Sequence, residues 1–212
     1  MNRTAAAFHE AGHAVAADAM QRRVVLLSIE AIGRLGGVCY SVAADAPQIA
    51  EAEVASEIRA RAHAPLRPLP PLRFDPIETE PVLLLLLAGP VAQRRYSGAI
   101  AFDWQTGGAD LLAAISLVGG PDGWRHFFAA LGRTEELVRD RWEEVTALAA
   151  ALWLHGRLDG AAVAATLERV QSRPRWTREE HDGSDGVPPV PGLQESRLNP
   201  RQRSTAYLRG HG

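Results

Sequence analysis

The sequence predicts a mainly helical domain that carries a small β-hairpin and is followed by a C-terminal tail of different composition. Apolar and Ala-rich segments of helical length recur between residues 3 and 170. Residues 24–42 are instead rich in β-branched and aliphatic residues around a glycine turn. From residue 172 onward Pro, Gly, Asp, Arg and Ser dominate, which is typical of disorder. We therefore expect a domain at 1–171 and a disordered tail at 172–212.

The predicted elements of the first half are two helices, a hairpin and a linker. The helices are expected at residues 3–21 and 46–62, the strands at 24–32 and 38–42, and the linker at 64–76. The first helix contains no Pro. Gly33, Gly36 and Gly37 supply the turn between the two strands. The linker contains five prolines, which exclude a regular helix or strand there.

The second half is predicted to be helical throughout. The helices are expected at residues 78–96, 109–118, 121–131, 134–155 and 160–170. Residues 97–108 are expected to form a loop, and Asp159 is expected to cap the last helix. The strongest apolar run, 82–88, is far shorter than the roughly 20 residues that a membrane span needs. We expect it in a buried core helix.

The composition limits the possible partners and the compartment. The 212 residues are 46% apolar, enough for one domain with a sizeable core. A formal net charge of -2 gives no reason to expect nucleic acid or anionic lipid as a partner. Cys39 is the only cysteine, and no segment qualifies as a signal peptide, so a reducing, cytoplasmic location is expected. The 23 basic residues are all Arg, and a chain without Lys cannot form a conventional P-loop ATPase site.

The most specific pattern is His9-Glu10-Ala11-Gly12-His13, an H-E-x-x-H motif in the first predicted helix. Residues four apart lie on the same face of a helix, so His9 and His13 can offer two imidazole nitrogens to one Zn²⁺. Glu10 lies beside that face, where it can accept a proton from an attacking water. Gly12 costs the helix about 1 kcal/mol relative to Ala, which suggests that something approaches the backbone closely there.

A catalytic zinc usually takes a third protein ligand and leaves a fourth position for water. The metzincin arrangement, with His six residues after His13, is excluded because residue 19 is Ala. The remaining candidates are Asp103, Asp110, Glu78, Glu80 and His126. Asp110 stands out, because it lies where a Gly-rich loop enters an apolar helix. Its charge could equally serve only to stabilise the first turn of that helix.

The segment Phe8-His9-Glu10-Ala11-Gly12-His13-Ala14 resembles the active helix of the FtsH-type zinc metallopeptidases. These are normally the C-terminal protease domains of membrane-anchored AAA+ proteases. Three further segments resemble that family in the same order along the chain. They are Ser28-Ile29 through Gly36-Gly37-Val38, Leu86-Leu87-Ala88-Gly89-Pro90-Val91-Ala92 followed by Tyr96-Ser97-Gly98, and Thr106-Gly107-Gly108-Ala109-Asp110-Leu111. The resemblance covers residues 4–170.

The resemblance implies that Asp110 is the third zinc ligand. It also implies a helical, zincin-type metallopeptidase fold and a zinc-dependent endopeptidase acting on flexible or unfolded polypeptides. The chain departs from the family at Ala109, where the family has Asn, and at Gln93, where the family has Glu; residues 64–76 look like an insertion. From this sequence we expect neither the AAA+ module nor the membrane anchor. The expected partners are thus a polypeptide substrate and either an AAA+ ATPase or further copies of the chain.

Two other interpretations stay open. The missing ATPase module and the changes at Ala109 and Gln93 also fit a non-catalytic relative that binds zinc and recognises a polypeptide or an AAA+ partner. A purely structural zinc site would need four protein ligands, usually including cysteines, and Cys39 is the only thiol. The remaining histidines lack a spaced partner and are expected to be bystanders. They are His63, His126, His155, His181 and His211.

Overall fold

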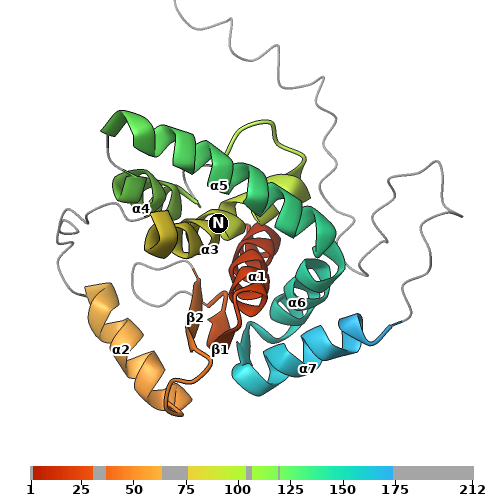
Figure 1. Cartoon of the computed structure of the whole chain (residues 1–212). Coiled ribbons are helices and arrows are strands. Elements are labelled where there is room, and N and C mark those ends of the chain that lie inside the picture. Colours follow the sequence, from red (N-terminus) through yellow and green to blue (C-terminus); the bar gives the residue numbers. More distant parts are fainter. Residues whose placement is uncertain (1, 31–36, 64–75, 104–106, 119, 174–212) are drawn as a thin grey trace, which may run out of the picture. The chain divides into compact units, whose positions relative to one another are not determined.

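The structure is a computed structural model of the chain, and it describes residues 2–30, 37–63, 76–103, 107–118 and 120–173 (Figure 1). The elements in order are α1 (Arg3–Ala19), β1 (Arg22–Ser28), β2 (Val38–Ala43), α2 (Glu51–His63), α3 (Pro76–Ser97), α4 (Gly108–Val118), α5 (Gly120–Asp140), α6 (Trp142–His155), β3 (Arg157–Asp159) and α7 (Gly160–Gln171). The prediction of a mainly helical chain with a small β element is confirmed. Almost all of the 172–212 segment and of the 64–76 linker lies outside the described residues.

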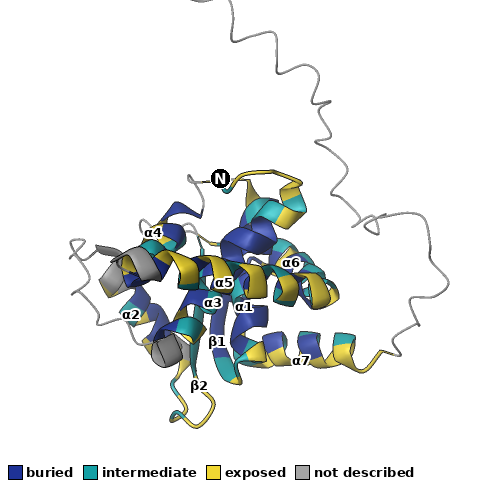
Figure 2. Cartoon of the chain, turned by 45° about the horizontal axis from the view of Figure 1, so that its top comes forward, coloured by how far each residue is buried: buried dark blue, intermediate teal, exposed yellow. Residues whose placement is uncertain are grey.

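Helix α1 is largely buried and packs against α3, α6 and β1 (Figure 2). It begins after Asn2, whose side chain accepts a hydrogen bond from the backbone N–H of Thr4 at 3.0 Å. At Gly12 the backbone of α3 comes so close that a Cβ would overlap with the carbonyl oxygen of Ala88. The close approach expected at this glycine is therefore present, and its partner is another helix of the fold.

The sheet has β1 at its centre, in the strand order β2-β1-β3, and both pairings are antiparallel. The hairpin prediction is confirmed for its two strands, with Ser28 opposite Val38. Of the predicted turn, Gly37 alone is described. The third strand, β3, has three residues and was not predicted, because so short a segment shows no alternation of apolar and polar residues.

An irregularity in the β1–β2 pairing lies between Val24 and Leu26. Such a bulge changes which face of a strand successive residues occupy. Val24 and Leu27 accordingly pack in the core cluster that contains α1, whereas Val25 and Leu26 pack with α2. The sheet is thus covered by α1 on one face and by α2 on the other.

Two helix boundaries differ from the predicted ones by more than two residues. Helix α2 begins at Glu51 instead of residue 46. Pro47 disfavours a helical conformation at Ala46, the predicted first residue. The predicted break near residue 132 is wrong, because α5 continues through Gly132 to Asp140. A single glycine costs a helix about 1 kcal/mol, too little to end one that buries an apolar face. The break lies at Arg141 instead.

The apolar run 82–88 lies in α3 and is only partly buried. Leu83 and Leu87 belong to the core, whereas Val82 is 43% exposed. None of the helices in the described ranges has the length and apolar content that crossing a membrane requires.

Candidate metal centre

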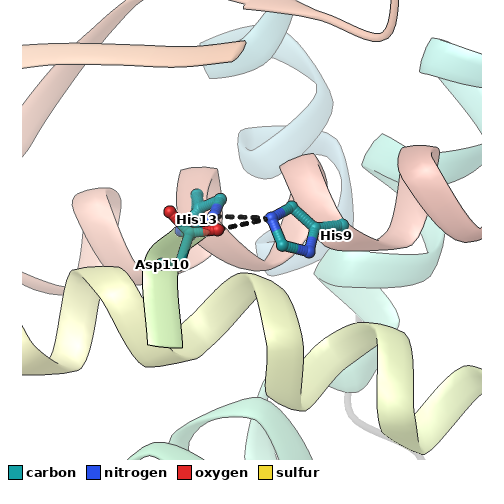
Figure 3. A group of neighbouring side chains, drawn as sticks. All are labelled: His9, His13 and Asp110. Carbon is teal, nitrogen blue, oxygen red and sulfur yellow. Dashed lines mark hydrogen bonds and ion pairs between the residues drawn. The ribbon is translucent and has the colours of Figure 1, made fainter. Parts of the chain in front are cut away.

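The three predicted ligands come together from two helices. His9 and His13 lie on successive turns of α1, and Asp110 lies in the first turn of α4. One donor atom of each residue lies within 4.8 Å of the other two (Figure 3). Helix α3 packs against both α1 and α4 and so fixes the distance between them.

The separations between the donor atoms suit one small cation. His9 Nε2 lies 3.1 Å from His13 Nε2 and 2.9 Å from Asp110 Oδ2. His13 Nε2 lies 3.5 Å from the same carboxylate oxygen. A tetrahedral zinc ion with ligands at about 2.0–2.1 Å holds neighbouring donors about 3.3 Å apart. Two imidazoles and a carboxylate at these separations could therefore hold zinc with little movement.

Helix α3 supplies a partner for the second nitrogen of each imidazole. His13 Nδ1 donates to the carbonyl oxygen of Leu85 at 2.6 Å, and His9 Nδ1 lies 3.1 Å from Gln93 Oε1. With a proton held on Nδ1, each Nε2 is the ring nitrogen available to a bound cation. The sequence identified neither partner. A backbone carbonyl leaves no sequence pattern, and Gln93 stood out only as a departure from the FtsH-type family.

Glu10 lies buried beside Gly37, the residue that precedes β2. Its exposed fraction is 6%, and a Cβ at position 37 would overlap with its Oε1. Burial raises the pKa of Glu10; the charges of His9 and His13 lower it, and that of Asp110 raises it, with a net increase. A carboxyl group with a raised pKa is better matched to accepting and returning a proton near neutral pH.

His13 and Asp110 form an ion pair in the metal-free chain. Burial by itself lowers the pKa of His13, but the hydrogen bond and charge of Asp110, the charge of Glu10 and the Leu85 carbonyl raise it to about 9. Burial by itself raises the pKa of Asp110, but hydrogen bonds and charges from His13 and His9 hold it well below its usual range. The cluster thus holds a proton at the position that a cation would occupy.

Among the described residues, none of the other candidate ligands belongs to this cluster. Glu80 pairs with Arg133 at 2.9 Å, and Asp103 accepts a hydrogen bond from the Gln93 amide that lies beside His9. The side chain of Glu78 lies outside the described residues. Among the described residues, His126 belongs to no group of three metal-binding side chains. Asp110 does occupy a first helical turn, as its alternative role requires, but its Oδ2 is directed at the two histidines.

Comparison with models of known protein families gives no match, and comparison with curated protein sequences gives no significant match. The fold and the site therefore define the chain only as a mainly helical protein with a candidate His-His-Asp metal centre. The FtsH-type resemblance rests on the residues quoted above.

Proposed function

We propose that this chain is an FtsH-type, zinc-dependent metalloendopeptidase that hydrolyses flexible or unfolded polypeptides. One observation carries the proposal. Donor atoms of His9, His13 and Asp110 converge within 4.8 Å, and the buried Glu10 lies one residue from the first of them. This is the set of groups that metal-assisted peptide hydrolysis needs: three ligands and a carboxylate base.

In this mechanism His9, His13 and Asp110 hold the ion. Zinc, when bound, supplies a Lewis acid that polarises the scissile carbonyl and makes water a better acid. Glu10 takes the proton of the attacking water and then passes it to the leaving amine. Its burial against Gly37 confines the carboxyl group and, by raising its pKa, allows it to act in both directions.

One edge of the sheet is suited to binding an extended substrate. Within the described residues β2 pairs only with β1, so it is an edge strand. It begins at Val38, directly after the Gly37 that contacts Glu10. An unfolded peptide that adds to this edge as a further strand would run close to the base.

The test is zinc content together with cleavage of casein or a flexible peptide by the purified chain. Glu10→Gln should keep zinc and lose about 10²–10⁴-fold in cleavage rate, because it removes the base and no ligand. Normal cleavage by Glu10→Gln would show the mechanism to be wrong. Stoichiometric zinc without turnover of any denatured substrate would instead favour a non-catalytic zinc-binding module that recognises a polypeptide or an AAA+ partner.

A further inference from the structure

Gln93 connects the candidate metal centre to a residue outside it. It lies on α3 with an exposed fraction of 5%. Its Oε1 is 3.1 Å from His9 Nδ1, and its Nε2 donates to Asp103 Oδ2 at 3.4 Å. Both ends of one amide are therefore engaged, one by an imidazole and the other by a carboxylate.

The Asp103 carboxylate determines which end of the amide faces His9. A carboxylate only accepts hydrogen bonds, so it selects the NH₂ group of Gln93. The amide oxygen then faces His9, and because that oxygen also only accepts, His9 must carry its proton on Nδ1. His9 Nε2, 2.9 Å from Asp110 Oδ2, is then the ring nitrogen that would ligate zinc in place of a proton.

We propose that Gln93 is a positioning residue of the metal centre, oriented by Asp103, that holds His9 in the tautomer able to ligate zinc through Nε2. The inference rests on the zinc centre of the proposed function and adds a residue to it. The Gln93 amide is a neutral acceptor. Asp110 is therefore the one negatively charged residue among the three ligands and their two α3 partners.

A carboxylate at position 93 would act differently on its two neighbours. Toward His9 it would form a charge-assisted hydrogen bond, which makes an imidazole a stronger metal ligand. Toward Asp103 it would place a second negative charge where the Gln93 amide now donates at 3.4 Å. The amide is the group that satisfies both neighbours at once.

The test measures zinc affinity of the full chain and its variants, with zinc alone as the probe and a chromogenic chelator as competitor. Gln93→Leu removes the acceptor and is expected to weaken zinc binding roughly 10–100-fold. Gln93→Glu keeps an acceptor and is expected to bind zinc at least as tightly as the wild type. Asp103→Ala removes the carboxylate that orients the Gln93 amide, and it is expected to weaken binding by less than Gln93→Leu does.

A second measurement reports on the tautomer directly. In the zinc-loaded chain, long-range ¹H–¹⁵N correlation spectra distinguish a His9 ring that is protonated on Nδ1 and ligated through Nε2 from the reverse arrangement. The wild type and Gln93→Glu should show the Nε2-ligated ring. Asp103→Ala should show a weaker preference for it, which a purely structural role of Asp103 would not produce.

Leu83→Met is the matched control, because Leu83 lies on the same helix in the core cluster formed with α4 and α5. It should lower stability slightly and leave zinc affinity unchanged. The inference is overturned if folded Gln93→Leu binds zinc as the wild type does, or if Gln93→Glu is as weak as Gln93→Leu. If Gln93→Leu does not fold, unchanged affinity and tautomer in Asp103→Ala overturn it. A wild-type chain that binds no zinc refutes the metal centre itself, whereas indistinguishable variants of a zinc-binding chain refute only the role of Gln93.

Discussion

Gly89 of α3 lies directly against the imidazole ring of His13 of α1. A Cβ at position 89 would overlap with His13 Nε2 and come within 2.8 Å of the two ring carbons beside it. The ring therefore occupies the space that any side chain at this position would fill. Since Leu85, one turn earlier on α3, accepts the Nδ1 proton of His13, a single helix provides both the acceptor and the space.

Gly89→Ala is expected to push the His13 ring away from Asp110. Because Nε2 is the atom that would ligate zinc, binding should weaken at least about 10-fold, and peptide cleavage should fall with it. Equilibrium dialysis against zinc measures the first effect. Gly132→Ala is the matched control, since a Cβ there meets nothing within 4 Å. It should raise the free energy of unfolding by about 0.5–1 kcal/mol and leave zinc binding unchanged. Equal zinc affinity in the two variants would contradict this role of Gly89.

The sequence predicted the two histidine ligands on α1, but it did not predict the contacts that α3 makes with them. The spacing of His9 and His13 follows from helical periodicity, so both ligands could be predicted from a five-residue pattern. Asp110 stood out by its place at the start of a helix, but only the resemblance implied that it is the third ligand, because contacts between distant segments leave no periodic signal. The roles of Gly89, Gln93 and the Leu85 carbonyl depend on how closely α3 packs against α1, which the sequence shows only indirectly, as the glycine at position 12.

The weak sequence signal of tertiary contacts also explains the errors in the predicted helix boundaries. Helices and strands with strong patterns were predicted, whereas boundaries set by tertiary contacts were not. The break between α5 and α6 falls at Arg141, where the side chain bonds to Asp18 of α1. Gly132, which a local criterion favours as a break, lies inside α5 because burial of the helix face outweighs its propensity.

Gly37→Ala tests the contact that confines Glu10. The added methyl group would overlap with the Glu10 carboxylate, so the base should move while His9 and His13 stay in place. Zinc content is expected to remain stoichiometric and the cleavage rate to fall by about 10-fold or more, less than when the base is removed. The cleavage rate of Glu10→Gln, measured in the same way, gives the rate expected when the base is absent. If Gly37→Ala loses zinc as well, the residue supports the ligands and not the base alone.

The stability of the metal-free chain should depend on pH in a defined window. The pKa of His13 is raised from 6.5 to about 9, so its stabilising effect is complete below pH 6.5 and is lost as pH rises toward 9. The pKa of Asp110 is lowered from 3.8, so its contribution is complete above that pH and is lost in more acidic solution. The pKa of Glu10 is raised from 4.5, so stability also decreases as pH rises above that value, because ionising a buried carboxyl group costs free energy.

Urea unfolding in the presence of a chelator measures this dependence. The free energy of unfolding should fall by up to about 3 kcal/mol between pH 6 and pH 9. The decrease should be much smaller in His13→Gln, which lacks the titrating group, and unchanged in His155→Gln, whose imidazole is exposed at the end of α6. A wild-type profile that is flat between pH 6 and pH 9 would show that His13 is not held in an ion pair.

Arg141 joins the start of α6 to the C-terminal turn of α1, the helix that carries both histidines. Its Nη2 bonds to Asp18 Oδ2 at 2.7 Å, and its Nε bonds to Glu144 Oε1 at 3.1 Å. Its Nη1 donates to the carbonyl oxygen of Val15 at 3.3 Å. The side chains of Arg141 and Glu144 are 16% and 10% exposed, so water can replace these contacts only in part.

Arg141→Met should therefore lower the free energy of unfolding by about 2–4 kcal/mol, since it leaves the Glu144 carboxylate buried without its cation. Arg139→Met is the matched control, because the ion pair that Arg139 forms with Asp140 is exposed on both sides. That change should stay within about 0.5 kcal/mol of the wild type in urea unfolding. Arg141 contacts none of the ligands, so the folded fraction of Arg141→Met should bind zinc with wild-type affinity. A loss of affinity in the folded protein would mean that the C-terminal turn of α1 positions the histidines as well as stabilising the helix.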